Sequence, residues 1–274
     1  INKKHYVTVF DKINTLEKNY NHKNLNFIKG DIFSANEIDL AIKKHDIVYH
    51  LAGMSDLNDT LYKPLETIKY NIIGTVNILQ SCVKYKVKRF IFASTVYVKS
   101  NEGGFYKSSK LSAESYIKEF NKLYGLKFTI LRYGSIYGPG ANNNNGVVKI
   151  INQAIKNKIV KYEGSPDTIR EYVHVDDVAR SSIEILNVKY LNKFINISGS
   201  YPIKIKDFIN MILETLNLKK KIIFTKKNQL GHYVITPYSY NDDLGIKINS
   251  SVNVDFREGV LQIIKSIKTK DGNN

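Results

Sequence analysis

Cysteine, tryptophan and proline are scarce in this chain of 274 residues, and long apolar runs are missing from it. Cys82 is the single cysteine, which excludes an internal disulfide and fits a reducing compartment. No stretch reaches the roughly 18 consecutive apolar residues of a transmembrane helix. The opening stretch INKKHYVTVF also lacks the apolar core of a signal peptide. We therefore expect a cytoplasmic protein without a membrane partner.

Acidic residues are few relative to basic ones: 25 Asp and Glu stand against 41 Lys and Arg, which gives a formal net charge of +16. A strong positive charge is one signature of nucleic-acid binding. Arg, the residue that most often reads base edges, is nevertheless rare, and the lysines are spread along the chain. We expect no nucleic-acid partner, although the charge would attract anionic small molecules such as nucleotides.

Short apolar runs alternate with segments of helical periodicity through the first two thirds of the chain. The runs are continuously apolar, which is typical of strands buried on both faces of a parallel sheet. The segments between them carry one apolar stripe each, for example Ile72, Val76, Leu79 and Val83. This order predicts a doubly wound α/β fold. The expected strands lie within 5–11, 25–31, 46–53, 88–95 and 127–134.

The character of the sequence changes after Gly140. The stretch GANNNNG predicts a loop of small polar residues, and mixed short elements follow it. They include a strand within 193–198 and helices over 206–217 and 255–267. We therefore divide the chain into a first domain at 1–140 and a smaller domain at 141–274. Strand 193–198 is expected to join the sheet of the first domain.

Tyr106 and Lys110 lie four residues apart in an otherwise ordinary amphipathic segment. Residues at this spacing share one helix face, with their side chains about 6 Å apart. A lysine ammonium beside a phenol stabilises the phenolate and lowers the tyrosine pKa from about 10. The pair is therefore a candidate general acid/base, although a surface tyrosine beside a solvated lysine explains the spacing alone equally simply.

Ser94 and Thr95 end the expected strand just upstream of that helix. The carboxyl ends of strands in an open parallel sheet border the ligand crevice. A hydroxyl at this position would hydrogen-bond a substrate oxygen and orient it toward Tyr106, whereas an ordinary Ser/Thr turn is the plainer explanation. The complete order is a strand that ends in a hydroxyl residue, a short loop, and a helix with Tyr and Lys. This order is more specific than the hydroxyl residue or the Tyr–Lys pair alone.

With these motifs in this order, the chain resembles an extended short-chain dehydrogenase/reductase of the nucleotide-sugar epimerase/dehydratase branch, similar to UDP-glucose 4-epimerases. The likeness covers nearly the whole chain. It implies a Rossmann-like, dinucleotide-binding first domain and a substrate-binding second domain. The motifs that carry it are FDK at 10–12, GDIFS at 30–34, HLAG at 50–53, NIIGTVNIL at 71–79, FASTVYV at 92–98, FYKSSK at 105–110, LRYGSIYGPG at 131–140 and REYVHVDDVA at 170–179.

The resemblance implies a role for each matching residue. Thr95, supported by Ser94, would polarise the sugar oxygen, and Tyr106 would move the proton. Lys110 would hold the nicotinamide ribose and lower the pKa of Tyr106, and Arg170 would pair with the substrate diphosphate. The implied cofactor is NAD, because the carboxylate of Asp11 would bind the adenosine ribose and repel a 2′-phosphate. The remaining cofactor contacts would come from Asp31, Ile32, Leu51, Ala52, Gly53, Asn71 and Tyr133.

Several of these residues also have plainer explanations. Asp11 fits a loop after a strand, and Arg170 fits a surface ion pair with the residue that follows it. His174, Asp176 and Asp177 have the side chains of a metal site, but Asp176 or Asp177 fits a helix N-cap better. We therefore expect no metal.

The family's phosphate-binding loop, Gly-x-x-Gly-x-x-Gly after the first strand, has no counterpart, because Gly30 is the first glycine in the chain. The loop should open the first helix roughly 20 residues before Asp11. We therefore expect that the first strand and its loop are absent and that the sequence is an N-terminally truncated form of a longer chain. Strands 5–11 and 46–53 would then lack their shared neighbour, and if the truncation is real, cofactor binding would be weak or absent.

Two further departures from the family bear on the reaction. Sugar 4,6-dehydratases carry Asp-Glu directly after the catalytic Thr, where this chain has Val96 and Tyr97. This difference argues against a dehydratase. The loop from Lys99 to Gly104 is shorter than in typical epimerases, which indicates an altered substrate pocket.

The resemblance implies an NAD-dependent epimerase that acts, through a transient keto intermediate, at C4 of a UDP-hexose-like nucleotide sugar. The alternatives are an NAD(P)-dependent sugar oxidoreductase or dehydratase and a non-catalytic remnant of the fold. Related enzymes commonly form homodimers through the helices that follow NIIGT and YKSSK, but Ile72, Val76 and Leu79 fit the core equally well.

Overall fold

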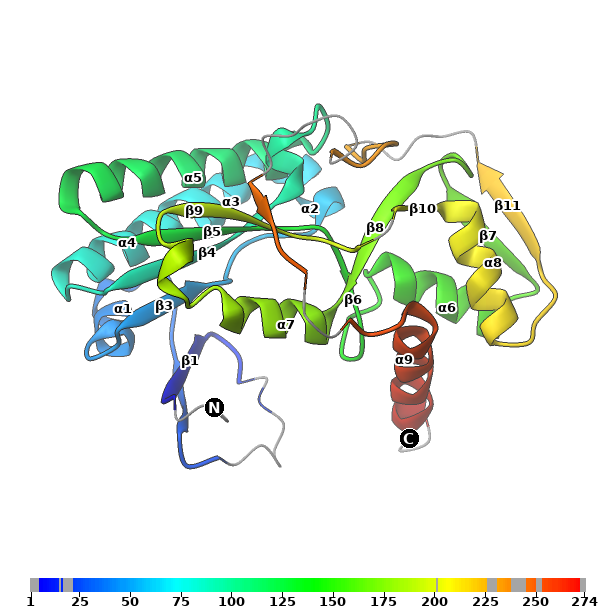
Figure 1. Ribbon diagram of the computed structural model, residues 1–274, viewed down its shortest axis with the longest axis horizontal. Coiled ribbons are helices and arrows are strands. Elements are labelled where there is room, and N and C mark those ends of the chain that lie inside the picture. Colours follow the sequence, from blue (N-terminus) through cyan, green and yellow to red (C-terminus); the bar gives the residue numbers. More distant parts are fainter. Residues whose placement is uncertain are drawn as a thin grey trace.

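The computed structural model describes residues 5–14, 16, 22–200, 202–225, 231–237, 245–249 and 253–271. Figure 1 shows an elongated molecule in which an open sheet with helices on both faces adjoins a smaller group of strands and helices. The N-terminal strand lies below the sheet, and the C-terminal helix lies beneath the smaller group.

The centre of the larger part is a parallel sheet in the order β12-β9-β5-β4-β3. β4 and β5, in the middle, are buried almost throughout, as expected of strands covered on both faces. These observations confirm the predicted doubly wound α/β fold, and the strand expected at 193–198 is β9. The strands are β3 (Ile47–His50), β4 (Arg89–Thr95), β5 (Phe128–Tyr133), β9 (Lys193–Ile197) and β12 (Ile246–Lys247).

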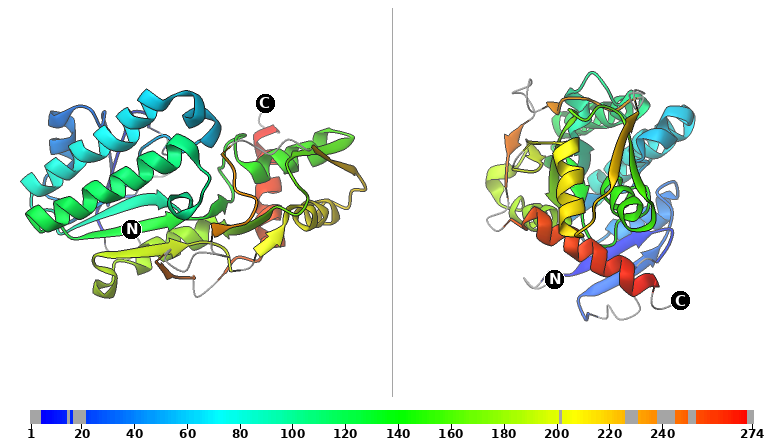
Figure 2. Two further views of the ribbon diagram at one scale, coloured as in Figure 1. Left: turned by 90° about the horizontal axis from the view of Figure 1, so that it is seen from above. Right: turned by 90° about the vertical axis from the view of Figure 1, so that its right-hand side faces the viewer.

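Helices cover both faces of this sheet, as the two turned views in Figure 2 show. On one face, Leu79 and Ile117 of the covering helices pack with Phe90 and Phe92 of β4. On the other face, Ile91 of β4 packs in a second apolar cluster with residues of α7. Because successive side chains of a strand point to opposite faces, β4 contributes to both clusters. The helices are α1 (Ala35–Ile42), α4 (Gly74–Lys84) and α5 (Gly104–Tyr124) on the first face and α7 (Val175–Glu184) on the second.

β1 (Val7–Asp11) and β2 (Leu25–Lys29) form a separate two-stranded parallel sheet. Figure 1 shows β1 below β3 rather than in the central sheet. Thr8 Oγ1 lies 2.9 Å from His45 Nε2, which links the pair to the turn before β3. Within the described residues no strand lies between β1 and β3, so the strands expected at 5–11 and 46–53 share no neighbour there.

The smaller part joins a three-stranded sheet, a two-stranded sheet and three helices around one apolar cluster. Ile151, Phe208, Ile212 and Val260 are fully or almost fully buried in that cluster. Its elements are β6 (Ser135–Tyr137), α6 (Gly146–Lys156), β7 (Ile159–Glu163), β8 (Ile169–His174), β10 (Pro202–Lys204), α8 (Ile205–Thr215), β11 (Lys221–Thr225) and α9 (Phe256–Asp271).

The chain does not divide cleanly at residue 140. After that point α7, β9 and β12 return to the central sheet, so the two parts are joined several times. Short helical segments complete the larger part. They are α2 (Leu57–Tyr62), α3 (Pro64–Ile68), η1 (Lys69–Ile73), η2 (Val96–Lys99) and η3 (Val188–Tyr190).

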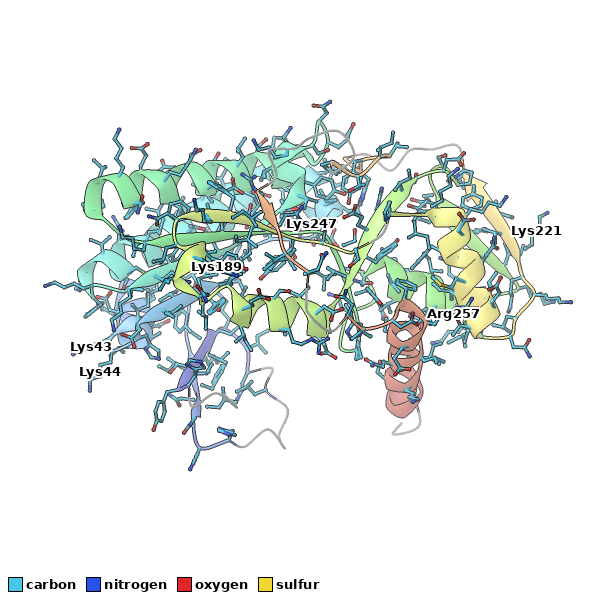
Figure 3. The ribbon with its side chains drawn as sticks, viewed as in Figure 1. Lys43, Lys44, Lys189, Lys221, Lys247 and Arg257 are labelled. Atoms are coloured by element: carbon cyan, nitrogen blue, oxygen red, sulfur yellow. The ribbon has the colours of Figure 1, made fainter. Side chains whose placement is uncertain are left out.

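The cationic side chains are widely distributed. In Figure 3, Lys43 and Lys44 lie at one end of the molecule and Lys221 at the other, with Lys189 and Lys247 between them. The positive charge is therefore not gathered at one end. Among the helices of the described part, none combines the length and the apolar character needed to cross a bilayer.

Candidate active site

Thr95 and Tyr106 meet at the carboxyl end of β4. Thr95 is the last residue of the strand, and the phenol of Tyr106, in the first turn of α5, lies close to its hydroxyl. They meet because Gly103 (φ 110°) and Gly104 (φ 48°) turn the chain directly into α5. A side chain at Gly103 would also lie 2.9 Å from the ring of Tyr97, so the short turn requires glycine.

Tyr106 is partly buried, and this burial raises its pKa to about 12, although the Thr95 hydroxyl acts in the opposite direction. The pKa of Tyr106 is therefore raised in the chain by itself, and its lowering by Lys110 beside a bound dinucleotide stays a prediction. Desolvation of the phenolate outweighs the interactions that favour it. At neutral pH the phenol is protonated.

Lys110 lies one turn beyond Tyr106 and also reaches β4. Its Nζ donates a hydrogen bond of 2.8 Å to the carbonyl oxygen of Ala93 and lies 4.8 Å from the centre of the Phe92 ring. Burial lowers the pKa of Lys110 to about 8, although the Glu114 carboxylate acts to raise it. Tyr106 and Lys110 therefore lie on the same side of α5 and face the end of β4, as their spacing predicts.

Ser94 faces α5 through its hydroxyl. Ser94 Oγ donates to Glu114 Oε1 at 2.6 Å, and Arg132 of β5 binds the same carboxylate. The Arg132–Glu114 distances are 3.1 Å from Nε to Oε1 and 2.7 Å from Nη2 to Oε2. Neither Glu114 nor Arg132 was predicted from the sequence, yet these two residues account for the orientation of Ser94.

Asn71 clamps the segment that follows β3. Its Oδ1 accepts from Met54 N at 2.7 Å, and its Nδ2 donates to Met54 O at 3.0 Å and to Ser109 Oγ at 2.9 Å. Gly53 has a φ of 150°, and a Cβ there would lie 2.6 Å from Asn71 Oδ1 and 3.7 Å from Lys110 Nζ. The exposed stretch that this clamp holds is Leu51, Ala52 and Gly53.

Asp11 and Asp31 lie at the carboxyl ends of β1 and β2. Asp11 is exposed and accepts a hydrogen bond from the backbone two residues further on. Asp31 Oδ2 forms an ion pair of 3.0 Å with Lys12 Nζ. Ile32 is 8% exposed and packs closely beneath Gly74 of α4. The residues predicted to border the adenosine therefore form one neighbourhood, at the end of the separate β1–β2 pair.

Tyr133 points away from this neighbourhood. Its backbone is paired with Thr95 in the register of β4 and β5, but its Oη lies 3.2 Å from Ser182 Oγ on α7. Tyr49 Oη donates to the carbonyl oxygen of the same Ser182 at 2.5 Å. The main chain of Tyr133 therefore lies beside Thr95, while its side chain packs on the opposite face of the sheet from α5.

Arg170 joins a row of aromatic side chains that was not predicted from the sequence. Its guanidinium lies 4.2 Å from the centre of the Tyr233 ring, and that ring lies 4.7 Å from the ring of Tyr97. The Tyr97 ring lies 6.3 Å from the ring of Tyr106, in an edge-on arrangement. Tyr97 Oη is 3.5 Å from His232 Nδ1. The row links Arg170 to Tyr106.

Burial and the charge of Arg170 lower the pKa of His232 to about 4, so its imidazole is neutral near pH 7. Arg170 is 7% exposed, and its Nη1 donates to the carbonyl oxygen of Ile169 at 3.0 Å. Its neighbour Glu171 instead pairs with Lys247 at 3.2 Å. The alternative of a surface ion pair between Arg170 and Glu171 is therefore wrong, because the two side chains face different surroundings.

The sequence profile described as the NAD dependent epimerase/dehydratase family matches residues 1–198 of the chain. The chain belongs to this family. It is 26% identical over 282 residues to a UDP-glucuronate 4-epimerase of Thermodesulfobacterium geofontis, a match that covers 94% of this chain and 86% of that protein.

Solved structures of the family share the fold. The UDP-glucose 4-epimerase of Thermotoga maritima with UDP-glucose aligns with a TM-score of 0.83 at 22% identity, covering 98% of this chain and 93% of that one. The UDP-glucuronic acid 4-epimerase of Bacillus cereus, in complex with UDP-glucuronic acid and NAD, gives 0.80 at 23% identity, with coverages of 91% and 83%. These likenesses confirm the predicted Rossmann-like fold.

NAD is the cofactor of this NAD-dependent epimerase/dehydratase family, and the described residues offer a matching cradle. The exposed backbone at 51–53 lies beside the Lys110 ammonium, and a Cβ at Gly53 would crowd both Lys110 and Asn71. The Asp31 carboxylate provides hydrogen-bond acceptors at the end of β2. These groups fit the two ribose-bearing ends of a dinucleotide, and the described residues assign no contact to its diphosphate.

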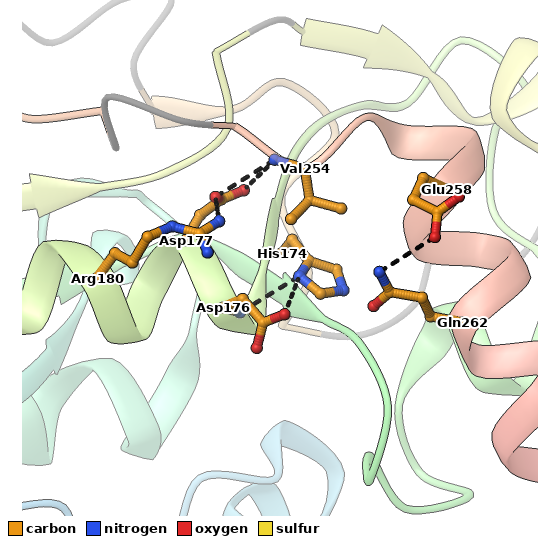
Figure 4. A network of polar contacts seen from close by, with 7 residues as sticks. All are labelled: His174, Asp176, Asp177, Arg180, Val254, Glu258 and Gln262. Atoms are coloured by element: carbon orange, nitrogen blue, oxygen red, sulfur yellow. Dashed lines mark hydrogen bonds and ion pairs between the residues drawn. The ribbon is translucent and has the colours of Figure 1, made fainter. Parts of the chain in front are cut away.

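The last family motif contains His174, Asp176 and Asp177, which serve structural roles (Figure 4). His174 is the N-cap of α7: its Nδ1 accepts from Asp176 N at 3.3 Å. Asp177 pairs with Arg180 and accepts from Val254 N, which ties α7 to the segment before α9. The predicted N-cap at Asp176 or Asp177 is therefore wrong, because α7 begins directly after His174. Across the described residues, no cluster of His, Cys, Asp and Glu side chains suits a metal ion.

Proposed function

We propose that this chain is an epimerase of a nucleotide-activated sugar, acting at C4 of a UDP-hexose-like substrate. The observation that carries the proposal is that Thr95, Tyr106 and Lys110 come together at the carboxyl end of β4, where Lys110 Nζ donates to the carbonyl oxygen of Ala93. Open α/β sheets bind their ligands at this end. A relative named UDP-glucuronate 4-epimerase, which this chain matches over 86% of its length, supports the same conclusion.

In this proposal two groups of residues hold the two ends of the cofactor. Lys110 and the exposed backbone of 51–53 hold the nicotinamide ribose, with Asn71 keeping that backbone in place. The main chain of Tyr133 borders the nicotinamide. Asp11, Asp31 and Ile32 receive the adenosine. When bound, NAD supplies a positively charged ring that accepts a hydride reversibly.

The protein residues supply the proton transfer. Thr95 donates or accepts a hydrogen bond at the sugar oxygen and orients it toward the Tyr106 phenol. Because the pKa of Tyr106 is about 12 in the chain by itself, the phenol must lose its proton more readily once ligands are bound. A ligand with positive charge near Tyr106 would have this effect. We therefore propose that Tyr106 is activated by cofactor binding rather than by Lys110 alone.

Arg170 is the proposed partner of the substrate diphosphate, and its contact with the Tyr233 ring supports this role. Stacking on an aromatic face holds the guanidinium in one orientation and leaves donors of its fork for an anion. Tyr97 lies between Tyr233 and Tyr106 and contacts His232, so Tyr97 and His232 would face the sugar.

A sugar panel tests the proposed reaction. Purified chain, saturated with NAD, is incubated with individual UDP-sugars, and the products are separated by chromatography. We expect one substrate to give its C4 epimer without net change in the reduced-nicotinamide absorbance. Tyr106→Phe should lower kcat by about 10²–10⁴-fold. Tyr116→Phe, on the exposed face of the same helix, should have no effect.

The alternative functions predict different results in the same assay. Sustained accumulation or consumption of reduced nicotinamide would indicate an oxidoreductase and contradict epimerisation. Absence of saturable NAD binding by calorimetry would support a non-catalytic protein. A dehydratase is disfavoured because Val96, buried and apolar, follows Thr95 where an acidic residue would be needed.

We also propose that the chain forms a homodimer through the outer face of α5. Phe105, Tyr116 and Leu123 recur along one side of that helix and are 47%, 47% and 67% exposed. Exposed large apolar side chains in one row are typical of an interface. A second copy would cover this row by antiparallel packing of the same helix. Light scattering should give twice the monomer mass, and Tyr116→Glu should shift it toward the monomer.

A further inference from the structure

Glu114 occupies the position that joins the catalytic face of α5 to the sheet. It lies one turn beyond Lys110 and two turns beyond Tyr106, so all three share one face of the helix. Glu114 is 2% exposed. Its Oε1 accepts from Ser94 Oγ at 2.6 Å, and its carboxylate pairs with Arg132 at 2.7 Å. One side chain therefore fixes α5 to β4 and to β5 at once.

We propose that Glu114 is a positioning residue of the active site, which sets the height of α5 on the sheet and the electrostatic surroundings of Lys110 one turn away. Apolar contacts between α5 and the sheet are not directional, whereas a buried bidentate ion pair has a narrowly defined geometry. With Glu114 fixed, Tyr106 is held at Thr95 and Lys110 at the carbonyl oxygen of Ala93. The expected effect on turnover rests on the proposed function, whereas the effect on Lys110 does not.

The charges around Lys110 explain why Glu114 controls its protonation. On α5 itself the neighbours are Tyr106 and Glu114. β4 contributes the ring of Phe92 and the carbonyl oxygen of Ala93.

β3 contributes His50, whose pKa is lowered to about 3 by burial and by the charge of Lys110, so this imidazole is neutral. β5 contributes Arg132, whose charge is bound by Glu114. Among the described residues, Glu114 is thus the group whose negative charge raises the pKa of Lys110.

Lysine side-chain NMR tests the proposal without any enzymatic assay. Chain labelled with ¹³C at the lysine ε-carbons is titrated with base, and the Lys110 signal is assigned by its loss in Lys110→Arg. We expect a midpoint near pH 8 in the unmodified chain. In Glu114→Gln the midpoint should fall by about one pH unit. Glu119→Gln, which removes an exposed carboxylate from the same helix, should leave it unchanged.

An unchanged Lys110 midpoint in folded Glu114→Gln would overturn the proposal. If Glu114→Gln does not fold, Ser94→Ala provides the second test, because it removes one hydrogen bond to Glu114 and keeps the charge. The midpoint in Ser94→Ala should stay near that of the unmodified chain, and a fall equal to that expected for Glu114→Gln would also overturn the proposal.

Activity then separates the two proposals. In Glu114→Gln we expect kcat to fall roughly 10–100-fold with little change in KM for the sugar nucleotide, because small displacements of reacting groups are costly. In the unmodified chain we expect activity to fall at high pH as Lys110 loses its proton. In Glu114→Gln this fall should occur at a lower pH, displaced by the same amount as the NMR midpoint. A fall in kcat without this displacement of the pH profile would indicate a merely structural role. If the unmodified chain epimerises no sugar, the proposed function fails while the NMR titration still decides the role of Glu114.

Discussion

The two ends of the proposed cofactor site are built by different means. At the nicotinamide end, the Arg132–Glu114 ion pair holds α5 to the sheet, and its side chains are 6% and 3% exposed. At the adenosine end, the Lys12–Asp31 ion pair has side chains that are 46% and 39% exposed, and it belongs to a two-stranded sheet outside the central one. The charged atoms are 2.7 Å apart in the Arg132–Glu114 pair and 3.0 Å apart in the Lys12–Asp31 pair, but only the Arg132–Glu114 pair is buried away from water.

This difference indicates where geometry is imposed and where it is adjustable. A buried charge that loses its partner is left without solvation, so the surroundings must keep both partners in place. An exposed pair exchanges its partner for water at little cost. The chemistry proposed for Tyr106 needs fixed distances, whereas binding of an adenosine tolerates adjustment. The following changes test this contrast.

Removal of one partner of the buried pair should have the largest effect. Arg132→Met leaves the Glu114 carboxylate buried without its cation, and we expect the free energy of unfolding to fall by about 3–5 kcal/mol. Urea denaturation followed by circular dichroism measures this. Lys12→Met, the matched change in the exposed pair, should not alter the midpoint measurably. Equal losses in the two variants would contradict the contrast.

Removal of the buried Lys110 charge should instead raise the free energy of unfolding. Its pKa is about 8 in the folded chain against 10.5 in the unfolded chain, so below pH 8 the folded state carries an unfavourable buried charge. Lys110→Met should therefore raise the free energy of unfolding by about 3 kcal/mol at pH 7.

The gain from Lys110→Met should shrink as the pH rises from 8 to 10.5, because the unmodified folded chain then loses this proton while the unfolded chain keeps it. Thermal unfolding at several pH values would follow the effect. A gain that is the same at pH 7 and pH 10.5 would show that burial of the charge is not its cause.

The clamp after β3 should respond to a single methyl group. Gly53→Ala places a Cβ 2.6 Å from Asn71 Oδ1 at a φ of 150°, and we expect a loss of about 1–3 kcal/mol in stability together with weaker NAD binding. Gly146→Ala is the matched control, since a Cβ there meets nothing within 4 Å. It should be neutral or stabilising by about 0.4–1 kcal/mol. Similar behaviour of the two variants would argue against a constrained clamp.

The smallest effect is expected at the adenosine end. Asp31→Asn removes the charge of the exposed pair and keeps its shape, so we expect the Kd for NAD to change by no more than about fivefold. Calorimetric titration gives this value. A change of a hundredfold or more would show that the adenosine end is as strictly organised as the nicotinamide end.

The sequence predicted the parts of the site that depend on local order. Strand, hydroxyl, loop and helix are read directly from FASTVYV and FYKSSK, and the i, i+4 rule places Tyr106 and Lys110 on one face. The parallel sheet follows from continuous apolar runs such as 88–95 and 127–134. These features are determined by residues that are close to one another in the sequence.

The parts that were missed or wrong depend on distant contacts. Glu114 pairs with Arg132 of another strand, and Tyr97 contacts Tyr233 from a segment far along the chain. The pKa of Tyr106 depends on how much water surrounds it, which the sequence does not specify. The N-cap of α7 was predicted at Asp176 or Asp177 rather than at His174, because the exact start of a helix shifts by one or two residues with the local backbone.

Cys82 gives the molecule a built-in reporter of its own opening. The only thiol of the chain lies on α4, fully buried in the apolar cluster that α4 shares with α1 and β4, and burial raises its pKa to about 12. A thiol in that state does not react with alkylating reagents. The rate at which such a reagent modifies the native protein therefore measures how often the packing between α4 and the sheet comes apart, with no label and no added cysteine.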